Sequence, residues 1–320
     1  MQELPLTSIP VILGQTASGK TSVGIDLAKI LDGEIISIDS RKVYEGLPIG
    51  TATPNGTREG SRYVVDGVTH HLMSFLPPDQ PYNAGDFAAD AERLIQEIRA
   101  RGKTPILVGG TGFYFKALEQ GLPPLPKADL PFRKNLENQM KKEGVTPLQQ
   151  ELASVDPEAA RVITEKDRHK IIRALEVFHS TGIPFSQWKH QKKRVSQNRY
   201  NVMGLQFAKD LLEKRIEERS QYMFESGMIE ETATVLKKGF SPDCHALASF
   251  GYREAVAVIQ GKMPRRDFLA RLIKGTKAYA KRQQTWFRTQ GRPAWFPCDS
   301  TSKSAEIALR MKAFCYTRPT

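Results

Sequence analysis

Cysteine is scarce in this sequence, and long apolar runs are absent. The three cysteines, Cys244, Cys298 and Cys315, stand far apart and form no C-x-x-C pair. This spacing argues against a zinc finger or a disulfide framework and fits a reducing cytoplasm. No run of about 18 apolar residues occurs, so we expect no membrane span and no membrane partner. The N-terminus lacks the basic and apolar regions of a secretory signal, so we expect no secretion.

The charge is strongly positive and unevenly distributed. The 320 residues carry a formal net charge of +12. Acidic residues slightly outnumber basic ones in residues 1–120, so the excess of positive charge comes from the rest of the chain. A small-molecule kinase has no need of this asymmetry, whereas a polyanion such as a nucleic acid would exploit it. A generally basic, solvated surface is the alternative interpretation.

The first third of the chain alternates between apolar runs and amphipathic segments. An apolar run at residues 9–13 precedes a glycine-rich loop, and residues 23–31 then show helical spacing. A second apolar run covers residues 34–39, an amphipathic helix begins near Asp86, and another strand pattern covers residues 104–110. This alternation predicts a mainly parallel sheet covered on both faces, the α/β fold of a phosphate-loop NTPase-like core.

The alternation stops at a proline-rich stretch, residues 121–131, which is typical of a linker. Helical patterns without strands follow, and they end in a basic segment, residues 189–200, that we expect to be mobile. A return to the sheet is expected at residues 201–207, with long helices at about 209–225 and 264–290. The chain is therefore divided into a first core part, an all-helical insertion domain that binds the polyanion, and a second core part with basic C-terminal helices: residues 1–120, 121–200 and 201–320.

The loop GQTASGKT, residues 14–21, has every fixed residue of the G-x-x-x-x-G-K-[ST] phosphate-binding pattern. Its glycines let the backbone turn tightly, so that several N–H groups point at one anion, and the following helix adds its positive end. Lys20 adds a point charge, and Thr21 adds a hydroxyl for magnesium or a phosphate oxygen. The pattern predicts a di- or triphosphate site without identifying the group that the phosphates carry. The expected phosphate contacts are Gly14, Thr16, Ala17, Ser18, Gly19, Lys20 and Thr21.

A second group of polar residues is IDSRKVY, residues 38–44. Asp39 comes at the carboxyl end of an expected parallel strand, where open α/β sheets place their sites. Its position allows three roles: a magnesium ligand, a general base, or the N-cap of the next element. Arg41 and Lys42 beside it suit a phosphate-rich partner, although adjacent basic residues are commonly just solvated.

A third group is VGGTGFYFKAL, residues 108–118. Gly109 and Gly110 end a strand and let a substrate approach the backbone closely, and Thr111 offers a donor and an acceptor at that edge. The strand ends in glycine rather than in an acidic residue. The usual second acidic element of an ATP motor is therefore missing, which argues against a helicase or motor.

The expected helix at residues 264–290 is rich in basic residues. A solvated helix usually mixes charges of both signs, whereas this stretch has a single acidic residue, Asp267. We expect its basic stripe to contact nucleic-acid phosphates. The basic face comprises Arg271, Lys274, Lys277, Lys281 and Arg288, and an apolar face comprises Phe268, Leu272 and Tyr279.

With these motifs in this order, the sequence resembles the tRNA isopentenyltransferase family, the tRNA dimethylallyltransferases. The five motifs that carry the resemblance span nearly the whole chain: GQTASGKT, DSRKVY, GGTGFY, FGYRE and KRQQTWFR. Two positions depart from the family's usual pattern. Gln15 replaces a proline, which affects the stiffness of the loop more than its chemistry, and Lys42 replaces a glutamine, which puts one expected contact in doubt.

The resemblance implies a function. In this family the phosphate loop holds the diphosphate of dimethylallyl diphosphate, with Mg²⁺ at the position of Thr21, and the acceptor is the exocyclic amine of the adenosine immediately 3′ of the anticodon. Asp39 matches the family's general base, which gives the base role priority over the magnesium-ligand role. Thr111 matches a position near the acceptor base. Expected partners are dimethylallyl diphosphate and the tRNA anticodon stem-loop, and we expect a cytoplasmic monomer.

Further positions carry over by motif. Arg215 and Arg219 are candidates for gripping the diphosphate, although they could equally be arginines on a helix surface. The positions that the resemblance assigns to tRNA contact are Asp39, Ser40, Arg41, Lys42, Thr111, Arg133, His169, Lys170, Arg173, Leu247, Phe250, Gly251, Tyr252, Lys281, Arg282, Gln283, Thr285 and Arg288.

Two other functions remain open at this point. A small-molecule kinase that uses ATP shares the loop and the fold but leaves the basic insertion and C-terminal helix unexplained. A non-catalytic RNA-binding protein with a phosphate loop explains the charge but not the DSRKVY and GGTG strand ends.

Overall fold

The computed structural model describes residues 6, 8–60, 62–189, 191 and 195–317. The chain forms two compact units, each described by itself: a main unit of residues 1–119 and 196–320, and a helical unit of residues 120–195. These limits differ from our division at 120 and 200 because the chain rejoins the main unit before Tyr200, where a strand of the sheet begins. Part of the segment expected to be mobile, residues 190 and 192–194, lies outside the described residues.

The main unit is built on an eight-stranded sheet with the order β3-β4-β5-β2-β6-β1-β7-β8. The strands from β5 to β8 in this order pair in parallel, and only β3 and β4 run antiparallel to their neighbours. The expected mainly parallel α/β sheet is thus confirmed. The strands are β1 (Ile9–Leu13), β2 (Gly33–Ile38), β3 (Thr57–Glu59), β4 (Arg62–Val65), β5 (Val68–His71), β6 (Thr104–Gly109), β7 (Tyr200–Phe207) and β8 (Ala294–Cys298).

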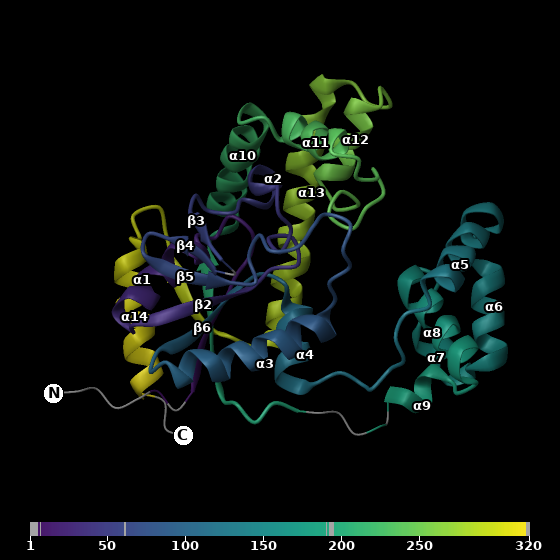
Figure 1. Ribbon diagram of the computed structural model, residues 1–320, viewed down its shortest axis with the longest axis horizontal. Coiled ribbons are helices and arrows are strands. Elements are labelled where there is room, and N and C mark those ends of the chain that lie inside the picture. The colour runs from purple at the N-terminus through teal and green to yellow at the C-terminus, as the bar shows by residue number, and fades with distance from the viewer. Residues whose placement is uncertain (1–5, 7, 61, 190, 192–194, 318–320) are drawn as a thin grey trace. The chain divides into compact units, whose positions relative to one another are not determined.

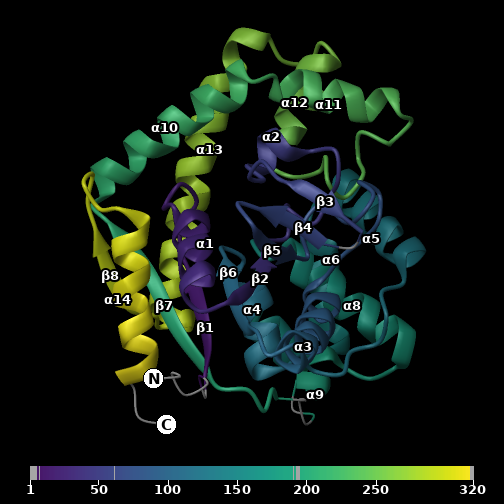
Figure 2. The same cartoon turned by 60° about the vertical axis from the view of Figure 1, so that its left-hand side comes forward.

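Helices cover the sheet and extend beyond it. In Figures 1 and 2, α1 and α14 lie side by side against the sheet, and the long helices α10 and α13 also lie side by side. The helices of this unit are α1 (Lys20–Ile30), α2 (Pro48–Thr51), α3 (Ala84–Ala100), α4 (Gly112–Gln120), α10 (Lys209–Glu225), α11 (Met228–Lys237), α12 (Tyr252–Ile259), α13 (Arg265–Trp286), a π-helical turn (Phe287–Gly291) and α14 (Ser304–Thr317).

Several apolar clusters hold the main unit together, of which two are large. β1 is buried along its whole length because parallel strands are covered on both faces. One core joins the strands to α1 and α14, whereas the other joins the loop at Val43 and Tyr44 to α11, α12 and α13. The second core fixes the loop that follows β2 against helices that are distant in sequence.

The helical unit has its own core, formed around Leu148, Leu152 and Ile171, all fully buried. The expected all-helical character of this block is confirmed. Its helices are α5 (Leu130–Glu143), α6 (Thr146–Val155), α7 (Pro157–Val162), α8 (Arg168–Thr181) and α9 (Phe185–Lys189). None of the helices in the described ranges of the chain is long and apolar enough to cross a bilayer.

Candidate functional site

The phosphate loop lies between the end of β1 and the start of α1. Ala17 and Gly19 have φ angles of 63° and 79°, the left-handed conformation that a tight turn of this kind requires. Gly14 has no room for a side chain, because a Cβ there would lie 2.7 Å from Ser18 Oγ. No side chain of the described residues caps the N-terminus of α1. The first N–H groups of α1 are therefore available to an anion in the loop.

Side chains from α10 and α13 clamp this loop. Gln283 Oε1 accepts a hydrogen bond from Thr16 N at 2.8 Å, and its Nε2 donates to Gly110 O at 2.9 Å. Gln15 Nε2 donates to Ala280 O at 2.9 Å, and Arg215 Nε donates to Ala17 O at 2.8 Å. The departure at Gln15 thus replaces the stiffness of proline with a bond to α13. Arg215 thus supports the loop and also lines the cavity in front of it, so its expected contact with the diphosphate stays a prediction.

The carboxyl ends of β2 and β6 bring Asp39 and Thr111 together, as expected for neighbouring parallel strands. Thr111 Oγ1 accepts from Ser40 N at 3.1 Å and lies 3.4 Å from Ser40 Oγ. Asp39 Oδ1 accepts from Arg41 N at 2.9 Å and from Lys42 N at 3.3 Å. These bonds fix the turn after β2 and the orientation of the carboxylate. Because both go to Oδ1, neither of these bonds uses Oδ2.

A cavity of about 760 Å³ opens in front of the loop and the carboxyl end of β2. It has a polar end at the loop and an apolar side formed by α10, α11 and α13. Its volume suits a small substrate together with part of a larger one. The polar lining includes Thr16, Lys20, Thr21, Asp39, Lys42, Arg219 and Arg282, and the apolar lining includes Met223, Met228, Phe250 and Leu272.

The polar end carries an excess of positive charge. Burial lowers the pKa of Lys20 to about 7; the charges of Lys42 and Arg219 add to this effect, and Asp39 opposes it. Burial also lowers the pKa of Lys42 to about 8, with Asp39 opposing the shift and Arg219 adding to it. Three cations thus face one carboxylate, and burial lowers the pKa of each of the three. An anion of two or more charges would stabilise the group.

Three residues of the basic helix lie in surroundings that the sequence did not indicate. Gln283 is largely buried against the phosphate loop, although it also lines the cavity, and its expected contact with tRNA stays a prediction. Tyr279 lies on the cavity wall rather than on an apolar packing face, and burial raises its pKa to about 12. Lys277 turns toward α10, where its Nζ lies 3.0 Å from Glu213 and 2.7 Å from Glu217. The basic stripe therefore omits Lys277.

The FGYRE segment lies mainly in the core. Leu247 is fully buried and Tyr252 is 2% exposed, because both pack in the cluster beneath α12 and α13. Tyr252 donates through its hydroxyl to Glu231 Oε1 at 2.7 Å and to Leu47 O at 2.9 Å. The side chains of these two residues are not accessible, and the tRNA contacts expected of the two residues stay a prediction. Phe250 does line the cavity.

In the helical unit, two of the expected tRNA contacts are engaged in an internal network. Arg133 Nη2 and Arg173 Nη1 lie 2.7 and 2.9 Å from Glu176 Oε2, and the Glu176 side chain is fully buried. Arg133 and Arg173 are therefore not free cations, and their first role is to neutralise Glu176. His169 is exposed, as is Lys170, whose Nζ lies 3.0 Å from Asp167.

Thr21 begins α1 and lines the cavity beside Lys20. Its hydroxyl fits a Mg²⁺ ion held mainly by phosphate oxygens and water, which is how this ion usually binds phosphorylated substrates. Within the described ranges no cluster of three or more histidine, cysteine, aspartate or glutamate side chains could hold a metal ion by itself. The fit therefore depends on a bound diphosphate.

Several residues of the site carried no signal in the sequence. Met223 and Met228 form part of the apolar wall, and Gln15 and Gln283 clamp the loop. A methionine or a glutamine on an amphipathic helix does not indicate which cavity it faces. Only the GGTG strand end and the phosphate loop suggested that a partner for Gly110 or Thr16 would be needed.

A phosphate loop, a carboxylate at the next strand end and an apolar wall around one cavity define a phosphate-loop transferase of the α/β class. The family model described as IPP transferase matches residues 42–290. The tRNA dimethylallyltransferase of Elusimicrobium minutum (strain Pei191) is 42% identical over 278 residues, 87% of this chain and 90% of that protein. That of Geobacter sulfurreducens is 40% identical over 308 residues, 95% of this chain and 96% of that protein.

The chain therefore belongs to the IPP transferase family, which confirms the family indicated by the five motifs. Among solved structures, the full-length tRNA isopentenylpyrophosphate transferase from Bacillus halodurans superposes with a TM-score of 0.68 at 34% identity. The superposition covers 97% of both chains.

Proposed function

We propose that the protein transfers the dimethylallyl group of dimethylallyl diphosphate to the exocyclic amine of the adenosine immediately 3′ of the anticodon in tRNA. The observation that carries the proposal is the shared cavity, which joins an anion site to a carboxylate oriented by its own turn. The products are N6-dimethylallyladenosine and diphosphate. Membership of the family and the names of the relatives support this assignment.

The phosphate loop would hold the diphosphate. The bond between C1 of the prenyl group and the bridging oxygen breaks, and the diphosphate leaves with the electron pair. The loop N–H groups, Lys20 and Arg219 would stabilise the charge that develops on that oxygen, since they are already in place before it forms. Bound Mg²⁺, held at Thr21, would supply further positive charge to the diphosphate. The apolar wall with Met223 and Met228 suits the prenyl group.

Asp39 would act as the general base. The exocyclic amine of adenosine is a poor nucleophile because its lone pair is delocalised into the ring. As the new bond from nitrogen to C1 forms, Asp39 Oδ2 takes a proton from the amine while Oδ1 stays bound to the turn. Thr111, held by Ser40, would contact the acceptor base. The adenosine must be turned outward from the anticodon loop to reach this position.

The exposed cations of α13 would hold the tRNA backbone. Arg282 lines the cavity, Lys281 and Thr285 are exposed on the same helix, and Arg288 is exposed in the π-helical turn that follows it. The anticodon stem-loop would contact these residues together with Ser40 and Arg41, and the exposed His169 and Lys170 of the helical unit would add contacts elsewhere on the tRNA.

The test is direct. The protein is incubated with unmodified tRNA, Mg²⁺ and dimethylallyl diphosphate, and the nucleosides are then analysed for N6-dimethylallyladenosine. A Lys20→Met variant serves as the control for a contaminating activity, because it removes the cation of the loop. Absence of the product with the wild-type protein would refute the proposal, and transfer of phosphate from ATP to a small molecule would favour a kinase instead.

A further inference from the structure

A second, much smaller cavity of about 20 Å³ lies behind the phosphate loop. Its lining comes from the start of α1 on one side and from strands of the sheet on the other, including Thr21, Ser37 and His70. Lys42 and Asp39 line both this cavity and the large one in front. A volume of this size holds about one water molecule.

His70 presents an unused acceptor to this cavity. It lies on β5 opposite Ile35 and is 1% exposed. Its Nδ1 lies 3.0 Å from Val68 O, which can only accept, so Nδ1 carries the proton and Nε2 is an acceptor. Among the described residues Nε2 has no hydrogen-bond partner. A buried acceptor without a donor lowers stability, so a donor in the cavity is expected.

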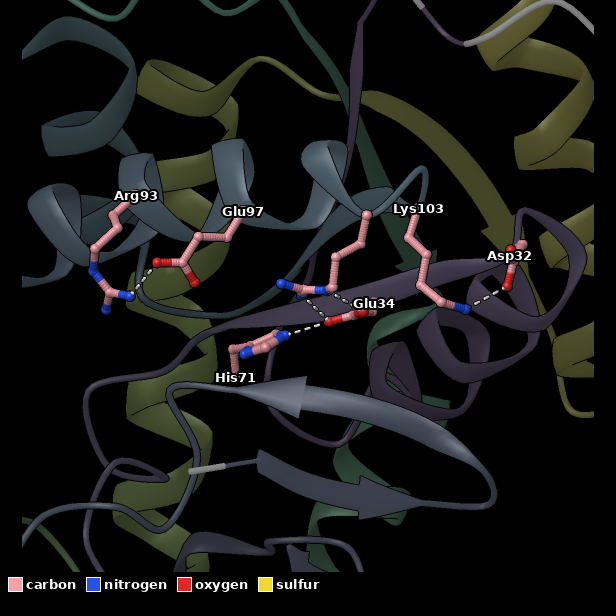
Figure 3. Close-up of polar contacts among 7 residues, drawn as sticks. Asp32, Glu34, His71, Arg93, Glu97 and Lys103 are labelled. Carbon is pink, nitrogen blue, oxygen red and sulfur yellow. Dashed lines mark hydrogen bonds and ion pairs between the residues drawn. The ribbon is translucent and has the colours of Figure 1, made fainter. Parts of the chain in front are cut away.

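The neighbouring His71 is held in a different way. Figure 3 shows His71 facing Glu34; Nε2 lies 2.6 Å from Glu34 Oε2, which also accepts from Arg101 at 2.8 Å. Because successive residues of a strand point to opposite faces of the sheet, His70 points to the other face. This buried ion-pair group fixes β5 against β2 and thereby fixes the direction of His70. The orientation of the unpartnered nitrogen is set by the strand.

Lys42 lines the same small cavity and can supply the missing hydrogen-bond donor through a water molecule. A lysine ammonium has three N–H groups and no acceptor. One water molecule in the small cavity can accept a hydrogen bond from Lys42 Nζ and donate one to His70 Nε2. This bridge would hold the ammonium at the boundary between the two cavities, beside Lys20 and Arg219. The glutamine usual in the family has no charge at this position.

We infer that Lys42 is a diphosphate ligand in this protein, and that His70 is the residue that positions it. The inference rests on the proposed function, since it assigns Lys42 to the diphosphate rather than to the tRNA contact expected from the motif. Its backbone supports the assignment, because Lys42 O accepts from Ser74 N and Lys42 N donates to Asp39. The backbone of Lys42 is thus fixed at both groups, and the residue lines both cavities.

The first experiment compares the wild-type protein with Lys42→Gln by calorimetric titration with inorganic diphosphate and Mg²⁺, without tRNA. A charge-assisted hydrogen bond accounts for a loss of roughly 10- to 100-fold in affinity. Affinity for unmodified tRNA should change by less than about threefold. The opposite pattern, with intact diphosphate binding and weaker tRNA binding, would overturn the assignment. This titration measures no prenyl transfer, so its result stands even if the transfer assay that tests the proposed function is negative.

The second experiment tests His70 with His70→Leu, which removes the acceptor, and His70→Gln, which restores one. His70→Leu should weaken diphosphate binding in the wild-type background but not in the Lys42→Gln background, because the bridge then has no ammonium to hold. His70→Gln should recover part of the loss. An equal loss for His70→Leu in both backgrounds would reduce His70 to a packing role.

Discussion

The substitution Asp39→Asn separates the two proposed roles of Asp39, which are to hold the turn after β2 and to act as the general base. An asparagine Oδ1 can still accept from Arg41 N and Lys42 N, at the 2.9 and 3.3 Å seen for the carboxylate. The turn after β2 should therefore persist. The amide cannot take a proton from the adenosine amine, so the variant lacks only the base. Removal of a general base slows a reaction by about 10²- to 10⁴-fold, or about 2.7–5.4 kcal/mol in the barrier.

The loss of negative charge has a second effect that the assay must exclude. Asp39 raises the pKa values of Lys20 and Lys42, so its neutralisation lowers both further and reduces the positive charge near pH 7. This would weaken diphosphate binding without changing the chemical step. Single-turnover transfer, measured at saturating concentrations of both substrates and below pH 7, keeps the lysines protonated and reports only the chemistry.

The rate of Asp39→Asn decides whether Asp39 acts as the base. A single-turnover rate for Asp39→Asn within about threefold of wild type would remove Asp39 from the base role. Asp39→Ala is the companion variant, since it loses the turn as well as the base. If Asp39→Ala is slow and Asp39→Asn is not, Asp39 acts by holding the turn rather than by taking the proton.

Three further predictions follow from the loop clamp and the charges. Gln283→Leu leaves Thr16 N and Gly110 O without partners and should lower the melting temperature and weaken diphosphate binding, by calorimetry; unchanged values would show that the clamp is dispensable. The double change Lys274→Ala with Lys281→Ala should flatten the log–log salt slope of tRNA binding by roughly 1.4–1.8. The control Lys277→Ala should change the slope by less than half a unit, because Lys277 is paired with Glu213 and Glu217. Equal effects per lysine would show that Lys277 also contacts the tRNA. The protein should take up protons when it binds diphosphate near pH 7, because an anion raises the pKa of Lys20 from about 7. The affinity for diphosphate should therefore fall as the pH rises above that value. Equal heats of binding in buffers of different ionisation enthalpy would contradict this.

The parts of the site that could be predicted are those made by short segments of chain. A strand, a glycine-rich loop and a helix follow one another without a break, so the position of Lys20 and Thr21 was evident from spacing alone. Asp39 and Thr111 are 72 positions apart in the sequence, yet each ends a parallel strand, and the carboxyl ends of neighbouring strands meet at one edge. The pair was predictable from the topology of the sheet, without knowledge of any contact between the two residues.

The unpredictable parts depend on which face of a helix packs against what. α13 has basic residues on several faces, so periodicity could not separate Lys277, which turns to Glu213, from Lys281, which is exposed. The antiparallel strands β3 and β4 and the edge strand β8 were also missed. They are short and follow turn-rich segments, so they lack the long apolar run that indicates a buried strand. In the helical unit, the i,i+3 spacing of Arg173 and Glu176 was a usable signal for an ion pair.

The two departures from the family pattern fall around a site made largely of backbone. Under the proposed function, the diphosphate would meet the N–H groups at the start of α1, whose positions are set by the φ angles of Ala17 and Gly19, together with the cations beside them. A change at position 15 or 42 therefore alters how the loop is supported or how much charge surrounds it, so the affinity for diphosphate should change while these N–H groups stay in place. Gln15 takes its support from Ala280 of α13, the same helix that presents Lys281 to solvent. One face of α13 thus supports the phosphate loop, and another face exposes cations to solvent. Substitutions on the first face should therefore affect diphosphate binding, and those on the second should affect tRNA binding.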